Sequence, residues 1–101
     1  KDPNSMVNFY IGNAYCGKGN FSLGIENYLR ALEIYPHNGD IYNNLAWAYL
    51  RENRIEEGSQ AIQKALALEP DNPAYLDTKR TIEDARERLS PSPGNALPGQ
   101  R

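Results

Sequence analysis

Apolar residues recur along the chain at helical spacing. Leu45, Ala48 and Tyr49 illustrate the pattern, because steps of three and four residues place them on one face of a helix. Pro36 and Pro70 each follow such a stretch. A helix ends before a proline because proline lacks a backbone N–H and restricts the residue before it. The pattern therefore predicts a chain of α-helices separated by short turns.

Turn and capping residues divide this pattern into helix pairs. Asn38 and Asn72 stand just after the two prolines and suit the N-cap of the next helix, and Pro73 suits the first helical position. Residues 17–20, Gly-Lys-Gly-Asn, are expected to form a turn within the first pair, with residues 52–54 as its counterpart in the second. A further helix is expected from Pro73 onward.

The pattern also repeats at a fixed interval along the chain. Residues 11–15 align with residues 45–49, and residues 30–32 align with residues 64–66. A fixed period in the range of roughly 20–50 residues indicates an array of helix pairs, which stack because a single pair cannot bury its own apolar face. Such an array presents an extended surface to a partner rather than enclosing a catalytic pocket.

Both units resemble the tetratricopeptide repeat (TPR). Its pattern has an aromatic residue, Leu-Gly and Tyr on the first helix, then Ala, an aromatic residue and Pro on the second. The matching residues are Phe9, Gly12, Tyr15, Phe21, Tyr28, Ala31 and Pro36 in the first unit, and Tyr42, Leu45, Ala46, Tyr49, Ile62, Ala65 and Pro70 in the second. The resemblance implies an all-α fold, a fragment of a right-handed TPR-type α-solenoid with about five helices.

Glycines mark both agreement with the family and departure from it. Gly12 and Ala46 are small at matching positions, which suits a close crossing by the second helix of each unit. Gly24 and Gly58 stand where the family favours Ala. Because a glycine inside a helix costs about 1 kcal/mol relative to Ala, the two second helices are expected to be weaker than is usual in the family.

We expect five segments along the chain. They are a stretch that resembles a vector-derived linker (1–5), TPR repeat 1 (6–37), TPR repeat 2 (38–72), a capping helix (73–89) and a flexible tail rich in Pro and Gly (90–101).

The two ends of the array are expected to differ. In the capping helix the apolar positions are Tyr75, Leu76, Ile82, Ala85 and Leu89. Charged Lys79, Arg80 and Glu83 replace the apolar or small residues of a further repeat, so one face should meet water, as the end of an array requires. Repeat 1 has no such cap, and Leu23, Ile25 and Leu29 are expected to add apolar surface on that side.

Composition narrows the function. The chain has 101 residues, enough for one domain, and a net charge of −2, which gives no electrostatic footprint for nucleic acid or for a lipid surface. No apolar stretch has the length of a membrane span, so no membrane insertion is expected. A single cysteine cannot form an internal disulfide and favours a reducing, cytoplasmic compartment without fixing the localisation.

The chain offers little chemistry for catalysis or metal binding. Cys16 and His37 are its only thiol and imidazole, and a catalytic pair must be hydrogen-bonded and oriented by a third group. Cys16 falls late in a helix and His37 in the turn between repeats, and two ligands on separate elements make a poor metal site. We expect neither an enzyme nor a bound cofactor or metal.

The resemblance implies a groove lined by the first helices of successive units, which holds an extended peptide or a partner helix. Carried over by repeat position, the groove residues are Phe9, Asn13, Cys16, Asn43, Asn44, Trp47, Leu50, Arg51, Asp77, Thr81 and Asp84. Trp47 aligns with Asn13 and lies one helical turn from Arg51, and Trp and Arg dominate binding hot spots. The alternative for Trp47 is packing inside the array as a core residue.

Some members of the family grip a C-terminal carboxylate with Lys, Arg and Asn. Asn13 and Asn44 match the two Asn positions of that pattern, but the cationic positions hold Phe9, Ala74 and Thr78. Without cations a carboxylate is poorly held, so a carboxylate clamp is not expected here.

The leading hypothesis is a non-enzymatic adaptor that binds a protein or peptide in its groove. Asp40, Asp77 and Asp84 outnumber Arg51 around it, which favours a ligand with apolar anchors and some positive charge. The alternative is a structural scaffold in which the repeats self-associate into a homo-oligomer through the uncapped side of repeat 1.

Overall fold

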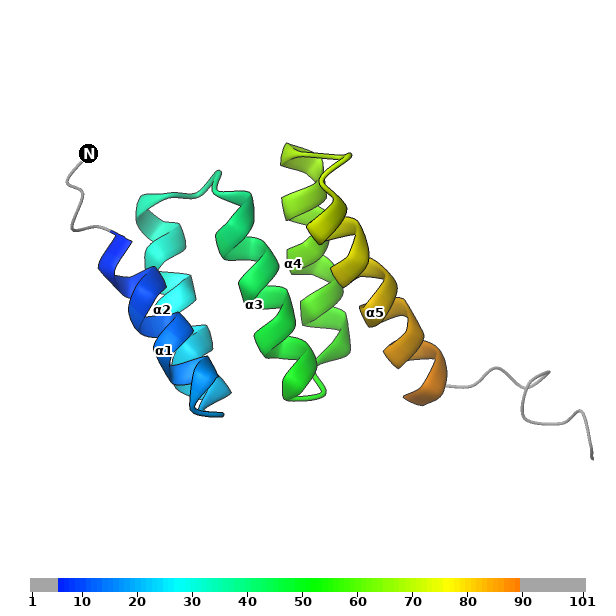
Figure 1. Ribbon diagram of the computed structural model, residues 1–101, viewed down its shortest axis with the longest axis horizontal. Helices are drawn as coiled ribbons and strands as arrows, with labels where there is room; N and C mark the ends of the chain where they lie inside the picture. The colour runs from blue at the N-terminus through cyan, green and yellow to red at the C-terminus, as the bar shows by residue number, and fades with distance from the viewer. Residues whose placement is uncertain (1–5, 90–101) are drawn as a thin grey trace, which may run out of the picture.

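The computed structural model describes residues 6–89, which form five α-helices and no strand (Figure 1). The helices are α1 (Val7–Gly17), α2 (Phe21–Ile34), α3 (Gly39–Arg51), α4 (Ile55–Leu68) and α5 (Pro73–Leu89). The predicted all-α fold is thereby confirmed. The expectations of a linker at 1–5 and a tail at 90–101 lie outside the described residues.

The helix pairs follow one another along the molecule, with α1 and α2, which overlap in this view, at one end of the row, α3 and α4 in the middle and α5 at the other end (Figure 1). The pairs α1–α2 and α3–α4 form two hairpins, α2 packs against α3, and α5 packs against α4 and α3. Between residues 6 and 89, no helix combines the length and the apolar character that crossing a membrane requires.

Asparagine caps begin three of the helices. Asn38 Oδ1 accepts a hydrogen bond from the Ile41 N–H at 3.1 Å, and Asn72 Oδ1 accepts one from the Tyr75 N–H at 3.2 Å. Asn20 caps α2 in the same way at 3.3 Å. These bonds satisfy backbone donors that the first turn of a helix leaves without partners, and they confirm the predicted caps at Asn38 and Asn72.

The turns inside the two hairpins share one backbone feature. Gly19 has φ +85°, and Asn53, which is its equivalent in repeat 2, has φ +62°. Glycine and asparagine are the residues that adopt this left-handed conformation most easily, so both hairpins reverse direction at the same place in the repeat.

Close helix crossing explains the glycines of repeat 1. A Cβ atom on Gly12 would lie 2.7 Å from the ring of Tyr28, and one on Gly24 would collide with Cys16 Sγ. The backbones of α1 and α2 therefore approach closely only because neither position carries a side chain. The view of Gly24 as a weak point of its helix is incomplete, since the packing of repeat 1 uses its small size.

The core lies between the hairpins and under α5. Its most deeply buried residues include Tyr28, Ala31, Ile41, Leu45, Ala46, Ile62, Ala65, Tyr75 and Ile82. One face of α5 is buried and the other exposes Lys79, Arg80 and Glu83. Leu76 and Leu89, which the apolar spacing places on its packed face, are exposed, and Thr78 is buried instead.

The expected apolar surface on α2 is wrong in its position. Ile25 belongs to the core, because α2 is already covered on that side. Leu29 is exposed, but it lies beside Tyr42 of α3 and Lys64 of α4 rather than on the open side of repeat 1. Leu23 is half-buried, and the exposed large apolar residues at the open end of repeat 1 are Val7, Tyr10 and Ile11 of α1.

Candidate functional site

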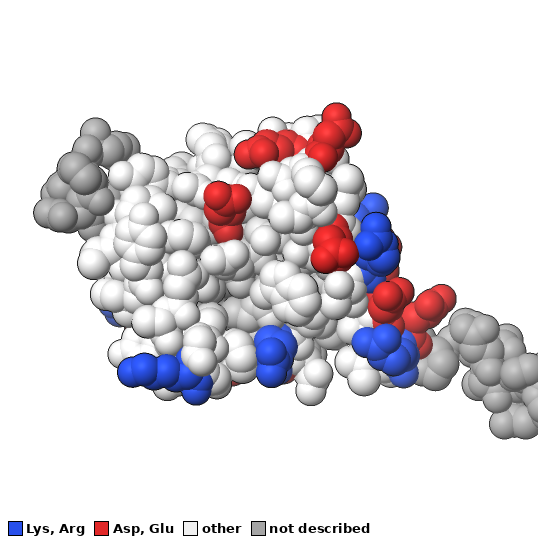
Figure 2. Space-filling view, viewed as in Figure 1, with Lys and Arg blue, Asp and Glu red and all other residues white. Residues whose placement is uncertain are grey.

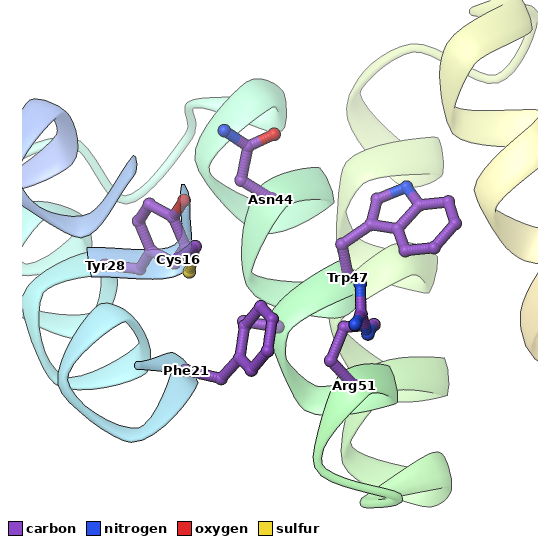
Figure 3. Close-up of a pocket in the computed structure, with 7 residues that line it drawn as sticks. Cys16, Phe21, Tyr28, Asn44, Trp47 and Arg51 are labelled. Atoms are coloured by element: carbon purple, nitrogen blue, oxygen red, sulfur yellow. The ribbon is translucent and has the colours of Figure 1, made fainter. Parts of the chain in front are cut away.

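A surface cavity of about 200 Å³ opens where the two repeats meet (Figure 3). Its lining comes from α1, α2 and α3 and consists of Cys16, Phe21, Tyr28, Asn44, Trp47, Ala48 and Arg51. Four of these, Cys16, Asn44, Trp47 and Arg51, are among the predicted groove residues.

Hydrogen bonds hold the α1 side of the cavity in place. The Oδ1 atom of Asn13 accepts from the Tyr28 hydroxyl at 2.6 Å and from Asn44 Nδ2 at 2.9 Å. Burial, with a smaller contribution from a hydrogen bond with Cys16, raises the pKa of Tyr28 well above its ordinary value. Tyr28 is therefore a permanent donor at neutral pH, and the three side chains tie both helices of repeat 1 to α3.

An equivalent bond ties α3 to α5. Trp47 Nε1 donates to Thr78 Oγ1 at 2.9 Å, and the Thr78 hydroxyl donates to the carbonyl oxygen of Ala74 at 3.0 Å. Trp47 and Thr78 lie one repeat period after Asn13 and Asn44, so the same two repeat positions are bonded at both junctions.

Trp47 consequently fits neither simple alternative of the sequence analysis. Its indole N–H is satisfied within the protein, yet the residue stays 38% exposed. In Figure 3 the indole ring points away from Phe21. Trp47 is nevertheless one of the residues that line the cavity. A partner would meet an anchored aromatic surface whose position is already set.

Arg51 closes the cavity opposite Tyr28. Its Cζ atom lies 4.9 Å from the centre of the Phe21 ring, within the range of a cation–π contact. Within residues 6–89, Arg51 has no ion-pair partner. The guanidinium is thus held over an aromatic ring with its hydrogen-bonding edges free to meet a ligand.

Cys16 contributes bulk rather than reactivity. Burial raises the pKa of its thiol, which keeps it protonated at neutral pH. His37 lies in the loop between α2 and α3 and does not line this cavity. Across residues 6–89 there is no group of three His, Cys, Asp or Glu side chains that could hold a metal ion.

Besides Asn13, three predicted residues on α1 and α3 do not line the cavity. Phe9 packs against Tyr28, with ring centres 6.0 Å apart, and Leu50 packs against the core. Asn43 is half-buried, and its Oδ1 has no hydrogen-bond partner in the described part of the chain. Their role in binding stays a prediction.

The predicted residues on α5 form a separate, charged edge. Asp77 is exposed and accepts a hydrogen bond from Arg80 at 3.0 Å, while the Thr81 hydroxyl donates to the Asp77 carbonyl oxygen at 3.0 Å. Asp84 is exposed as well. None of the three lines the cavity, and their contact with a ligand also stays a prediction.

Of the three lining residues that were not predicted, Ala48 belongs to the core, and the other two are Phe21 and Tyr28. Both belong to α2, whereas the expected groove used first helices only. One signal was available in the repeat alignment, because Phe21 is aromatic at the start of its helix where its counterpart Ile55 is aliphatic.

Comparison with known proteins agrees with this architecture. The family model described as "Tetratricopeptide repeat" matches residues 17–82. A relative, the peroxisomal targeting signal receptor of Kluyveromyces lactis, is 34% identical over 64 residues, which is 63% of this chain. The chain spans 11% of the length of that receptor. The family model covers more than half of the present chain. The chain therefore belongs to the tetratricopeptide repeat family, whose repeats mediate protein–protein interaction.

Proposed function

We propose that this protein is an adaptor that binds a peptide or helix of a partner, with one apolar side chain of the partner seated in the cavity between the repeats. The observation that carries the proposal is the set of residues around it: Trp47, Phe21 and Arg51 surround a hollow whose walls are fixed by hydrogen bonds. Aromatic residues and Arg are the usual anchors of protein interfaces.

The size of the cavity favours a side chain over a small molecule. Pockets for cofactors and drug-sized ligands occupy about 300–1,000 Å³. The cavity here, at about 200 Å³, is smaller. It suits a single aromatic or branched aliphatic residue of a partner, with the rest of the partner lying across the surface outside.

The relative supports a ligand of this kind. Its name describes a receptor for a targeting signal. For the present chain this supports recognition of a protein segment, without identifying the segment.

Charge suggests how the partner lies. Arg51 at the cavity favours a neutral or acidic group of the ligand there, whereas exposed Asp77 and Asp84 on α5 favour basic groups further along. We expect a partner with an apolar anchor and some positive charge beyond it, and an association rate that falls with added salt.

The test uses peptides selected from a random displayed library on the intact protein. Trp47 is the only tryptophan, so a change in its emission reports binding next to the cavity directly. Trp47→Ala should weaken binding of the selected peptides by about 2 kcal/mol, the scale of a hot spot, when affinity is measured by calorimetry.

Leu76→Ala is the matched control, because Leu76 is 40% exposed, as Trp47 nearly is, but does not line the cavity. This variant should bind normally. Equal binding by both variants would refute the cavity as the site. A loss of about 3–5 kcal/mol in unfolding free energy for Trp47→Ala, with unchanged affinity, would instead make Trp47 a structural residue.

Self-association as a structural scaffold is the second candidate function. One observation favours it: α1 leaves an apolar face uncovered at the end of the row of helices. This face and the cavity use different residues, so binding at one does not exclude binding at the other.

A further inference from the structure

The uncovered face of α1 consists of Val7, Tyr10, Ile11 and Ala14, which we call the α1 face. Steps of three and four residues place all four on one side of the helix. Val7 is 50% exposed, Tyr10 62% and Ile11 39%, and Ala14 is exposed as well.

Three of the four equivalent positions of repeat 2 are buried, and the fourth, Asn44, which corresponds to Tyr10, is half-buried. Ile41, Leu45 and Ala48 are the equivalents of Val7, Ile11 and Ala14, and their exposed fractions are 0%, 3% and 2%. They are buried because α2 packs on α3, whereas nothing in the described chain packs on the α1 face. The α1 face thus has the composition of an interface.

Charge distinguishes this end of the molecule from the other. Between Val7 and Gly17, α1 has no charged side chain. The helix at the opposite end, α5, carries Asp77, Lys79, Arg80, Glu83, Asp84, Arg86, Glu87 and Arg88. Figure 2 shows charged groups gathered over the α5 end, while the surface over α1 is uncharged except near its lower edge.

We infer that the α1 face is covered by a second copy of this chain, with α1 of one protomer packed against α1 of its partner across a twofold axis. The inference rests on the second candidate function, self-association, and names its geometry. An uncharged face can meet its own copy without bringing like charges together or burying unpaired ones.

The other surfaces of a second copy fit less well. In a second copy, α2 is already covered by α3, and α4 by α5. The surface that covers α3 within one chain is therefore not available to cover α1 of another. Its α5 end would place Lys79, Arg80 and Glu83 in the contact, and burying charges without partners is costly. Of the two helices at the ends of the row, α1 and α5, it is α1 that presents an exposed apolar face without charged side chains between residues 6 and 89.

A contact of this geometry produces a closed assembly, to which no further copy can be added through the same face. A face that meets its own copy forms an isologous dimer, whereas head-to-tail contacts build rings or filaments. The small Ala14 on the α1 face allows the two helices to approach closely. The expected product is therefore a dimer and no larger species.

The test is sedimentation equilibrium of the whole chain up to millimolar concentration. The unaltered protein should convert from monomer to dimer. Tyr10→Glu and Ile11→Glu should each raise the dissociation constant at least about tenfold, since each would bury a carboxylate at the contact. Leu76→Glu, which alters an apolar residue of similar exposure to Ile11 on α5, should dimerise normally.

Circular dichroism confirms that each variant is folded, and NMR of the unaltered protein gives a second readout. Amide shifts that change with concentration should be confined to α1 and its immediate neighbours. A monomer at every concentration would refute self-association altogether. A dimer that is unaffected by both α1 variants, or growth beyond a dimer, would leave self-association standing and refute the α1 contact.

Discussion

Two helices of this protein, α1 and α3, have the same place in successive repeats and very different surroundings. Ile11 and Leu45 are equivalent in sequence, yet the first is 39% exposed and the second 3%. The difference comes from the neighbour, because α2 covers α3 and no described helix covers α1 on that side. In a repeat array the burial of a residue is a property of the junction between units.

The two repeats also differ in how their hairpins pack. In repeat 1, Gly12 meets the ring of Tyr28, whereas the equivalent positions of repeat 2 hold Ala46 and Ile62. A smaller residue on the first helix is matched by a larger one on the second. Because the interior is closely packed, a larger residue on the second helix fits only when the residue opposite it on the first helix is smaller.

The largest expected effect separates the equivalent positions Leu45 and Ile11. Leu45→Ala should lower the unfolding free energy by about 3 kcal/mol, because it leaves a cavity in the core. Ile11→Ala should cost less than about 1 kcal/mol, since its surroundings are largely solvent. Urea unfolding of dilute protein, followed by circular dichroism, measures both.

Dilution matters in that measurement, because a dimer through the α1 face would raise the cost of Ile11→Ala as concentration increases. Equal costs for the two variants in dilute solution would show that something covers Ile11 in the isolated chain. The contrast between α1 and α3 would then be lost.

A smaller effect is expected from the exchange of residue sizes. Gly12→Ala should lower the unfolding free energy by about 1–2 kcal/mol, because the new Cβ would press on the buried Tyr28 ring and this outweighs the gain in helix propensity. Gly17→Ala in the same helix is the control, since an added Cβ there meets nothing within 4 Å. Thermal unfolding measures the stability of both variants. If Gly12→Ala proves more stable than the unaltered protein, the hairpin of repeat 1 has room for a Cβ atom beside Tyr28.

Local signals in the sequence predicted the helices well. The period of apolar residues and the caps at Asn38 and Asn72 depend on neighbours a few residues away, and the structure confirms them. Exposure was harder, because it depends on which helix lies opposite. The sequence places both Ile25 and Leu29 on the open side of repeat 1, and neither lies there.

The candidate site was predictable only in part, for a similar reason. Repeat position placed Cys16, Asn44, Trp47 and Arg51 together without any knowledge of the structure, and all four line the cavity. The bond between Trp47 and Thr78 joins side chains 31 residues apart. No local pattern reveals such a pair, since it depends on how α5 docks against α3.

The smallest expected effect concerns the charged end of the array. Arg86 of α5 donates two hydrogen bonds to the Glu56 carboxylate of α4, at 2.9 and 3.0 Å. The pair is largely in solvent, with side-chain exposures of 40% for Arg86 and 73% for Glu56, so Coulomb attraction is screened. Glu56→Gln should lower the unfolding free energy by only about 0.5 kcal/mol.

Urea unfolding at low and high salt tests whether this end is held by charge or by burial. The loss in Glu56→Gln should vanish at high salt, while Glu83→Gln, which alters a pair within α5, should change stability even less. A loss of several kcal/mol that persists in salt would mean that the ion pair docks α5. Burial of Tyr75 and Ile82 would then contribute less to the docking of α5 than the ion pair does. The two ends of the array would differ in the kind of interaction they use, and not only in whether their apolar face is covered.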